Sequence, residues 1–292
     1  MKYNKILIFV LIIAALFSIN AGKKKPSKMF FKDIEGYVFV PGGKVYIDND
    51  STGVKSFYIS KYEISNKQYT DFLICLNQQR QFDKLAVAQI DSIKWRDKYL
   101  YNEPYVTYYH VHPAYANYPL VNISYEGAVL YCQWLSEKYN KEHQNSVVVV
   151  EFRLPTRAEW IRAARGGDVL GIYSWNGPYL RNSKGTIMCN FLRYGDESIH
   201  YSNETKKLEV AGKDSRAAFA GDITAPVKSY FANGYGIHNM CGNVAEMVAE
   251  KGITCGGSYA EPGFDVRVES VKKYTEPSPT IGFRPIMTFI AK

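Results

Sequence analysis

The chain has 292 residues, of which 46% are hydrophobic, so it is long enough for one large domain or two small ones around a substantial core. Its formal net charge is +8, but six of the positive charges lie before Lys32, at Lys2, Lys5, Lys23, Lys24, Lys25 and Lys28. Because the basic surplus is confined to this N-terminal stretch, the composition gives little support to nucleic-acid binding.

The first residues have the pattern of an export signal. Lys2 and Lys5 precede an almost wholly apolar run from Ile6 to Ile19, and Ala21-Gly22 offers a small-residue cleavage site. We therefore expect a signal peptide over residues 1–21, a basic linker over 22–35 and one domain over 36–292. An uncleaved N-terminal anchor is the alternative. The first cysteine is Cys75, so lipid attachment to an N-terminal cysteine is not expected.

The five cysteines are widely spaced and show neither a CxxC motif nor a zinc-ligand spacing: Cys75, Cys132, Cys189, Cys241 and Cys255. An exported protein could pair some of them, and an odd count leaves at least one free or intermolecular. Buried free thiols are the alternative, because several of the five lie in apolar runs.

The N-terminal part of the domain alternates between strand and turn signals. Tyr37 to Ile47 predicts two short strands about a Pro-Gly-Gly turn, 48–53 a polar loop, and Lys55 to Ile64 a further strand. Ser65-Asn66 then predicts the N-cap of a helix over 67–76, where apolar residues recur at helical spacing.

Residues 77–119 form a long, aromatic and irregular stretch, which is typical of a functional insertion. Ser124 predicts the cap of a helix over 125–139, and a strand is expected over 147–154. Pro155-Thr156 opens another helix that runs through Arg165 and stops at Gly166-Gly167.

Residues 173–222 show little periodicity, and the chain closes with an apolar strand after Gly282-Phe283-Arg284. Two or three helices with short, scattered strands predict an α+β fold. Within it, the stretch from Tyr230 to Tyr259 holds six glycines among apolar and metal-ligating side chains, which predicts backbone folded around a site or a tight structural turn.

An ordered series of short motifs gives the chain a family resemblance. The series is Val40-Pro41-Gly42-Gly43, Tyr62-Glu63-Ile64-Ser65-Asn66, Phe152-Arg153-Leu154-Pro155-Thr156, Ala158-Glu159-Trp160, Asn233-Gly234-Tyr235-Gly236, Gly242-Asn243-Val244, Gly256-Gly257-Ser258 and Gly282-Phe283-Arg284. Over about residues 36–290 this resembles the formylglycine-generating (sulfatase-modifying factor) domain. The resemblance implies one compact α+β domain, related to C-type-lectin-like folds, with limited regular secondary structure.

Enzymes of that family oxidise a cysteine of exported sulfatases with copper held by two cysteines. Soft Cu(I) prefers such thiolate ligands. The corresponding positions here are Glu261 and Val266, and residues 260–266 contain no thiol. We therefore expect no copper and no copper-dependent oxidation. Ser258 matches an active-site serine of the family, and it is kept as a candidate binding residue beside a purely structural role.

The resemblance also implies a structural calcium, held by backbone oxygens of Cys241, Gly242 and Val244 and by the carboxylate of Glu246. Carbonyl and carboxylate oxygens are the ligands that Ca²⁺ prefers. Asn190 and Asp222 are candidates for a second calcium. The alternative is that Glu246 only accepts hydrogen bonds from the turn.

A narrower resemblance lies in the insertion, through Asn102-Glu103-Pro104-Tyr105 and His112-Pro113-Ala114-Tyr115, and later in the chain, through Trp175-Asn176-Gly177-Pro178-Tyr179. These motifs are similar to those of the catalytically inactive gliding-motility and type IX secretion lipoproteins of Bacteroidetes (the GldJ/GldK type). That resemblance implies a place at the periplasmic face of the outer membrane, although the lipidated cysteine of those proteins is missing.

The first hypothesis is thus a non-catalytic scaffold or binding protein of the cell envelope, in the periplasm or at the outer membrane, without lipidation or a transmembrane domain. Its partners would be envelope proteins, including subunits of secretion or gliding machinery. Aromatic residues of the insertion would contact the partner: Trp95, Tyr101, Tyr105, Tyr108, Tyr109 and Tyr115. The alternative for each ring is that it only packs beneath the insertion. The alternatives are a formylglycine-type oxidase or divergent enzyme, and a calcium-dependent carbohydrate-binding module.

Overall fold

A computed structural model describes residues 35–48, 50–96, 102–144, 146, 148–193, 199–210 and 223–291. Residues 36–292 form a compact second unit, apart from a first unit of residues 1–35. The predicted signal peptide and nearly all of the basic linker lie outside the described residues. Among the residues described, every helix and strand belongs to the second unit.

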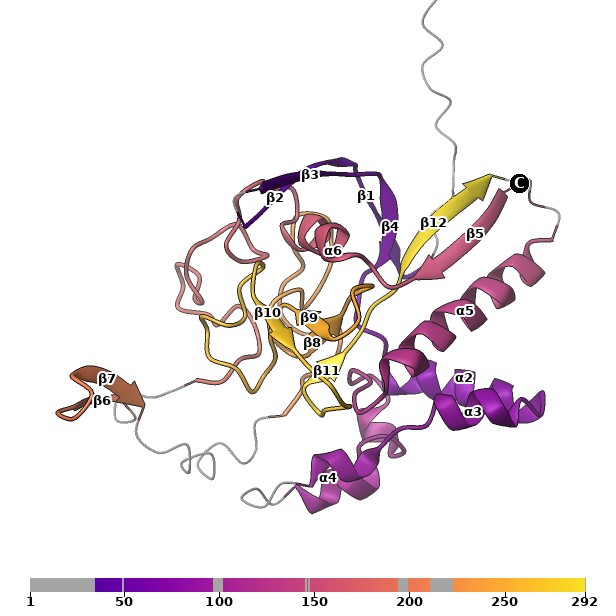
Figure 1. Cartoon of the computed structure of the whole chain (residues 1–292), viewed down its shortest axis with the longest axis horizontal. Helices are drawn as coiled ribbons and strands as arrows, with labels where there is room; N and C mark the ends of the chain where they lie inside the picture. The colour runs from indigo at the N-terminus through magenta and orange to yellow at the C-terminus, as the bar shows by residue number, and fades with distance from the viewer. Residues whose placement is uncertain are drawn as a thin grey trace, which may run out of the picture. The chain divides into compact units, whose positions relative to one another are not determined.

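The largest ladder is a four-stranded antiparallel sheet in the order β1-β4-β12-β5 (Figure 1). Its strands are β1 (Tyr37–Val40), β4 (Phe57–Ser60), β12 (Ile286–Ala291) and β5 (Val148–Arg153). Phe57 and Ile59 alternate into the core on β4, as a half-buried strand requires. The strands predicted around residues 37–47, 55–64 and 147–154 and at the end of the chain are confirmed.

A second, smaller sheet has the order β10-β9-β8-β11. It consists of β10 (Val271–Lys273), β9 (Ile253–Cys255), β8 (Ala245–Met247) and β11 (Ile281–Gly282). Only the β11–β8 pair is parallel. The buried strand β8 continues directly from the glycine-rich turn, so this sheet fixes the position of that turn.

Two hairpins correct the sequence-based expectations. β2 (Gly43–Ile47) pairs with β3 (Asp50–Val54), where a polar loop was predicted. The first four residues of β3 are exposed, so the strand lacks the apolar alternation that would reveal it. β6 (Ile199–Ser202) and β7 (Lys207–Val210) form a hairpin inside the stretch expected to be irregular.

The three longer helices begin where their capping residues predict. Ser65, Ser124 and Thr156 each accept a hydrogen bond from the first turn of α2 (Asn66–Gln78), α5 (Tyr125–Glu142) and α6 (Arg157–Ala164). α5 also covers the edge of the first sheet, because Asn140 Nδ2 donates to Val150 O at 2.7 Å and its Oδ1 accepts from Val150 N at 2.9 Å. These two bonds satisfy the backbone N–H and C=O of Val150, which blocks pairing with another chain at this position of the edge strand.

The long insertion is not irregular throughout. Its described residues, 77–96 and 102–119, contain four short helical segments: α3 (Phe82–Val87), η1 (Ser92–Trp95), α4 (Glu103–Tyr108) and η2 (Pro113–Tyr115). Each is too short to produce a helical period in the sequence, which explains why the prediction missed them.

The main hydrophobic core gathers side chains from the first sheet, α6 and the glycine-rich segments. Trp160, Met240, Val266 and Ile286 are among its fully buried members. A second cluster lies under the insertion and consists of Trp95, Tyr109, Val121 and Val244. Within the described ranges, no helix has both the length and the apolar character needed to span a bilayer.

Candidate functional site

The glycine-rich segment before β8 is held against α6 by side-chain and backbone contacts. Asn233 Nδ2 donates to the carbonyl of Ala163 at 2.8 Å, at the end of the helix. A Cβ at Gly234 would lie 2.2 Å from the carbonyl oxygen of Gly166, so only glycine fits this approach. The part of the Tyr230–Tyr259 stretch that precedes β8 is therefore a tight turn packed against a helix end.

Behind this turn, Arg284 and Glu246 form an ion pair inside the domain. Both side chains are buried, with exposures of 0% and 1%. Arg284 Nη2 lies 2.6 Å from Glu246 Oε1, and Arg284 Nε lies 2.7 Å from Glu246 Oε2. Trp160 Nε1 donates to the same Oε2 at 2.8 Å. The pair thus joins β8, the β11–β12 connection and α6.

Both terminal nitrogens of the Arg284 guanidinium also donate to backbone carbonyls. Nη1 donates to the carbonyl of Ser60 at 3.2 Å, and Nη2 donates to the carbonyl of His238 at 2.8 Å. Burial opposes the charged form, but the ion pair with Glu246 outweighs it and raises the pKa of Arg284. This arginine is a structural cation with no donor directed toward solvent.

Glu63 is a second buried carboxyl group in the same network. Its Oε1 accepts from Asn243 Nδ2 at 2.8 Å, and its Oε2 accepts from Asn239 Nδ2 at 2.9 Å. Burial raises the pKa of Glu63 to about 8, against the opposing attraction of Arg284. At neutral pH the protonated form therefore predominates, and Glu246 and Arg284 balance each other.

The residues predicted to bind calcium lie around this turn. Cys241, Gly242 and Val244 lead into β8, and the backbone N–H of Asn243 donates to the carbonyl of Asn190 at 2.8 Å. Asn190 is thus brought beside the turn, whereas Asp222 lies outside the described residues.

The donor set fits calcium only in part. Carbonyls of one turn are suitable oxygen ligands, but the Glu246 carboxylate faces Arg284 and Trp160. A calcium ion at Glu246 would have to share this carboxylate with the guanidinium. Calcium binding stays a prediction.

The loop after β9 holds Ser258 and Glu261 in direct contact. The backbone N–H of Ser258 donates to Glu261 Oε2 at 2.7 Å, and its hydroxyl bonds to the same oxygen. Lys272 of β10 pairs with Glu261 Oε1. Ser258 is fully buried, so it supports the loop and cannot contact a partner directly, which corrects its assignment as a binding residue.

A pocket of about 390 Å³ opens beside this loop. Its walls carry both charge signs and one exposed ring, from Gly257, Glu261, Phe264, Asp265, Arg267, Ser270, Val271 and Lys272. Arg267 lies over the Phe264 ring at 3.5 Å. Val266, by contrast, points into the main core and is fully buried.

Two of the predicted partner-binding aromatics are core residues. Trp95 and Tyr109 have exposures of 1% and 0%, and the Tyr109 hydroxyl lies 2.7 Å from both the Pro119 carbonyl and the Thr224 hydroxyl. Their assignment to a contact surface is therefore wrong. Their rings lie 4.6 Å apart between centroids and support the insertion from beneath.

Other aromatics of the insertion do reach the surface. Tyr105 and Tyr115 are partly buried, and Tyr108 is 52% exposed. A groove of about 440 Å³, here termed the insertion groove, is lined by Pro104, Tyr108, His112, Ala114 and Tyr115. Tyr101 lies outside the described residues.

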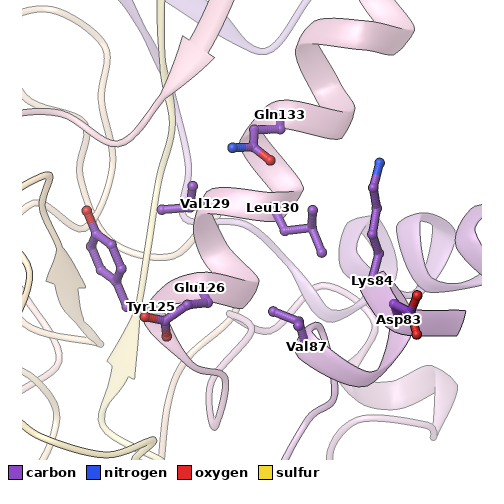
Figure 2. Close-up of a pocket in the computed structure, with 8 residues that line it drawn as sticks. All are labelled: Asp83, Lys84, Val87, Tyr125, Glu126, Val129, Leu130 and Gln133. Atoms are coloured by element: carbon purple, nitrogen blue, oxygen red, sulfur yellow. The ribbon is translucent and has the colours of Figure 1, made fainter. Parts of the chain in front are cut away.

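A further cavity of about 370 Å³ lies between α3 and α5 (Figure 2). Val87 of α3 and Leu130 of α5 contribute to its apolar wall, with Asp83, Lys84 and Glu126 at its borders. None of the site residues predicted from the sequence lines this cavity.

Sequence reasoning missed the parts of the site that depend on pairing across the chain. Arg284, Glu63 and Lys272 had no assigned role, although a lone charge within the apolar run Ile281 to Ile286 is a signal of a buried ion pair. The sequence around Lys272 contains no comparable signal.

A family model described as the sulfatase-modifying factor enzyme 1-like domain matches residues 23–289. The formylglycine-generating enzyme of Thermomonospora curvata is 32% identical over 134 residues, which are 46% of this chain and 34% of that protein. The formylglycine-generating enzyme of Mus musculus is 25% identical over 224 residues, 68% of this chain and 50% of that protein. The matched part thus spans a third to a half of these relatives.

Solved structures with the same fold are more distant in sequence. The crystal structure of CarF superimposes with a TM-score of 0.56 at 21% identity and covers 86% of this chain and 97% of that one. PvdO from Pseudomonas aeruginosa gives a TM-score of 0.53 at 18% identity, with coverage of 86% and 93%. These two likenesses concern the fold alone.

Proposed function

Because the chain belongs to the sulfatase-modifying factor enzyme 1-like domain family, we propose that it uses this fold as a non-catalytic binding or scaffold protein of the cell envelope. The proposal rests on the residues found at the two positions where the family's chemistry requires cysteines. Its site of partner contact is the insertion groove.

The observation that carries the proposal is the state of Glu261. This residue stands at a position where the resemblance places a copper-binding cysteine, and its carboxylate is bound to Ser258 and Lys272. A carboxylate is a poor ligand for soft Cu(I), and this one already has a cationic partner. Val266, at the other such position, is an apolar core residue.

The thiols that the chain does have are unsuited to the same chemistry. Of the five, Cys75 is partly buried and the others are buried. Burial raises the pKa of Cys241 and that of Cys255 to about 12. Since the thiolate is the reactive form and the metal ligand, burial disfavours both roles for Cys241 and Cys255 at neutral pH.

The insertion groove supports a binding role. Tyr108 and His112 are exposed beside the partly buried Tyr115, and Val111 next to them is 76% exposed. Exposed rings above a packed aromatic base form the kind of surface that partner chains use. Export to the periplasm or to the periplasmic face of the outer membrane is part of the proposal and draws on the N-terminal sequence pattern. A role in gliding or type IX secretion completes it and draws on the Asn102–Tyr105, His112–Tyr115 and Trp175–Tyr179 motifs.

Cross-linked envelopes that contain the tagged chain offer the decisive experiment. We expect envelope subunits to co-purify in fixed proportion, and the double variant Tyr108→Ala/His112→Ala to lose them. Its melting temperature should stay close to that of the parent, because both side chains are exposed in the groove. Tyr179→Ala is the matched control, because Tyr179 is 74% exposed and lies outside the groove. Equal recovery with the double variant would rule out the groove as the interface, and recovery of the chain alone would overturn the scaffold proposal.

The alternative is an enzyme, and it is favoured by relatives that are formylglycine-generating enzymes. It predicts aldehyde formation on a cysteine-containing sulfatase peptide in the presence of Cu(I) and oxygen. The proposal made here predicts no aldehyde, with an active formylglycine-generating enzyme as the positive control.

A further inference from the structure

Two buried thiols from distant parts of the chain, both free in the structure, lie close to the glycine-rich turn. Cys189 follows the irregular segment after α6, and Cys241 lies in the turn before β8, with exposures of 3% and 1%. Both belong to the main hydrophobic core, together with Tyr173. Neither has a role in the proposed binding function.

The backbones that carry these two residues are in contact. The N–H of Asn243 donates to the carbonyl of Asn190 at 2.8 Å, which joins the residue after Cys189 to the turn that contains Cys241. A Cβ at Gly242 would lie 2.2 Å from that carbonyl and 3.4 Å from Cys189 Sγ. The Cys189 sulfur therefore rests against the residue that follows Cys241.

The electrostatics of the two groups agree with this geometry. Burial raises the pKa of Cys189, and the neighbouring Cys241 raises it further. Burial raises the pKa of Tyr173, and Cys241 and Cys189 raise it further.

We propose that Cys189 and Cys241 form a disulfide when the protein folds under oxidising conditions. The bond forms by exchange: the thiolate of one cysteine attacks an oxidised dithiol carrier, and the thiolate of the other displaces it. The two thiols lose two protons and two electrons, the Sγ–Sγ bond forms, and the carrier leaves as its reduced dithiol. Attack occurs during folding, before burial raises the thiol pKa values.

The bridge would tie the turn to the segment that supplies Asn190. It closes the loop from 189 to 241, which contains the β6–β7 hairpin. A cross-link across a loop of this length restricts the unfolded chain strongly. The turn, and the Asn190–Asn243 contact within it, would then persist where the reduced protein loses them.

Oxidative refolding of the full chain in a glutathione redox buffer, followed by alkylation and tryptic mapping, tests this inference. The five cysteines fall in separate tryptic peptides, with Cys189 in residues 185–193 and Cys241 in residues 229–251. We expect these two peptides to be linked with the loss of two hydrogen atoms and to separate on reduction, while the peptides of Cys75, Cys132 and Cys255 carry the alkyl label. Full alkylation of all five, or linkage of any other pair, would overturn the proposal.

Variants separate the bridge from general effects of cysteine loss. Reduction should lower the melting temperature of the oxidised parent by roughly 5 to 15 °C, and it should leave Cys189→Ala/Cys241→Ala unchanged. Cys132→Ala is the matched control, because Cys132 is equally buried but lies on α5, and it should keep the reduction-sensitive shift. An equal response to reduction in the double variant and the parent would refute the assignment.

Discussion

Replacement of Arg284 by methionine tests the buried network more directly than any other change. Met is apolar and similar in length, so the substitution removes the charge and the five donors with little loss of volume. In the variant, Glu246 keeps the hydrogen bond from Trp160. The carbonyls of Ser60 and His238 lose the hydrogen bonds that Arg284 donates. The substitution also leaves Glu63 and Glu246 as two buried carboxyl groups without a cation.

The size of the effect follows from the burial of both partners. Breaking a buried ion pair by removing one side costs about 3–5 kcal/mol of unfolding free energy, because the other charge stays buried and unpaired. Lys67→Met provides the matched control, since the Lys67–Asp71 pair on α2 is exposed at 64% and 56% and should contribute less than about 1 kcal/mol.

Urea denaturation of the parent, both single variants and Arg284→Met/Glu246→Gln supplies the measurement. The double variant should be more stable than the sum of its parts predicts, because the neutral amide introduced by Glu246→Gln leaves no uncompensated charge behind. If Arg284→Met does not fold, Arg284→Lys is the alternative variant. It keeps the positive charge but loses the planar guanidinium and its paired donors, so it should show part of the loss in unfolding free energy. A change below about 1 kcal/mol for Arg284→Met, or strict additivity in the cycle, would refute the reasoning.

Three further predictions concern protons and calcium. Burial lowers the pKa of His110 to about 3, so its contribution to stability is present above pH 6.5 and is lost as the pH falls toward 3. Urea denaturation should show that the free energy of unfolding falls by about 1–2 kcal/mol between pH 7.5 and pH 5, and that His110→Gln removes this loss. An equal loss in the variant would contradict the assignment. The pH dependence expected from Glu63 has the opposite sign, because burial raises its pKa to about 8. Its contribution to stability is present below pH 4.5 and is lost as the pH rises through 8. The free energy of unfolding should therefore fall by about 1 kcal/mol from pH 7 to pH 9 in the parent and not in Glu63→Gln. If Glu246 binds calcium, millimolar Ca²⁺ should raise the melting temperature of chelator-treated protein by several degrees, and Glu246→Gln should abolish the shift; an unchanged melting temperature would leave Arg284 as the cation that serves this carboxylate.

Features of the fold that rest on local chemistry could be predicted from the sequence. Ser65, Ser124 and Thr156 identify helix starts because a cap acts within three residues of itself. β3 could not be found, since its first four residues are exposed and its stability comes from pairing with β2. Segments of three to six residues in the insertion fall below the length at which a helical period is visible.

The candidate site depends on contacts that no local pattern contains. Glu63, Glu246 and Arg284 meet only after the two sheets have formed, and nothing near any of them in sequence names its partner. The glycine-rich turn was located correctly because Gly234 and Gly242 report a close backbone approach. Trp95 and Tyr109 were misplaced because an aromatic ring in an insertion has the same sequence signal whether it packs inward or outward.

The position of β12 in the first sheet has a consequence for how the chain acquires its structure. β12 is synthesised after every other strand described here, yet it lies between β4 and β5 and pairs with both. The sheet therefore cannot close cotranslationally from its N-terminal half, and contacts of such long sequence separation form slowly. β4 and β5 can therefore be joined in this sheet only after β12 has been synthesised.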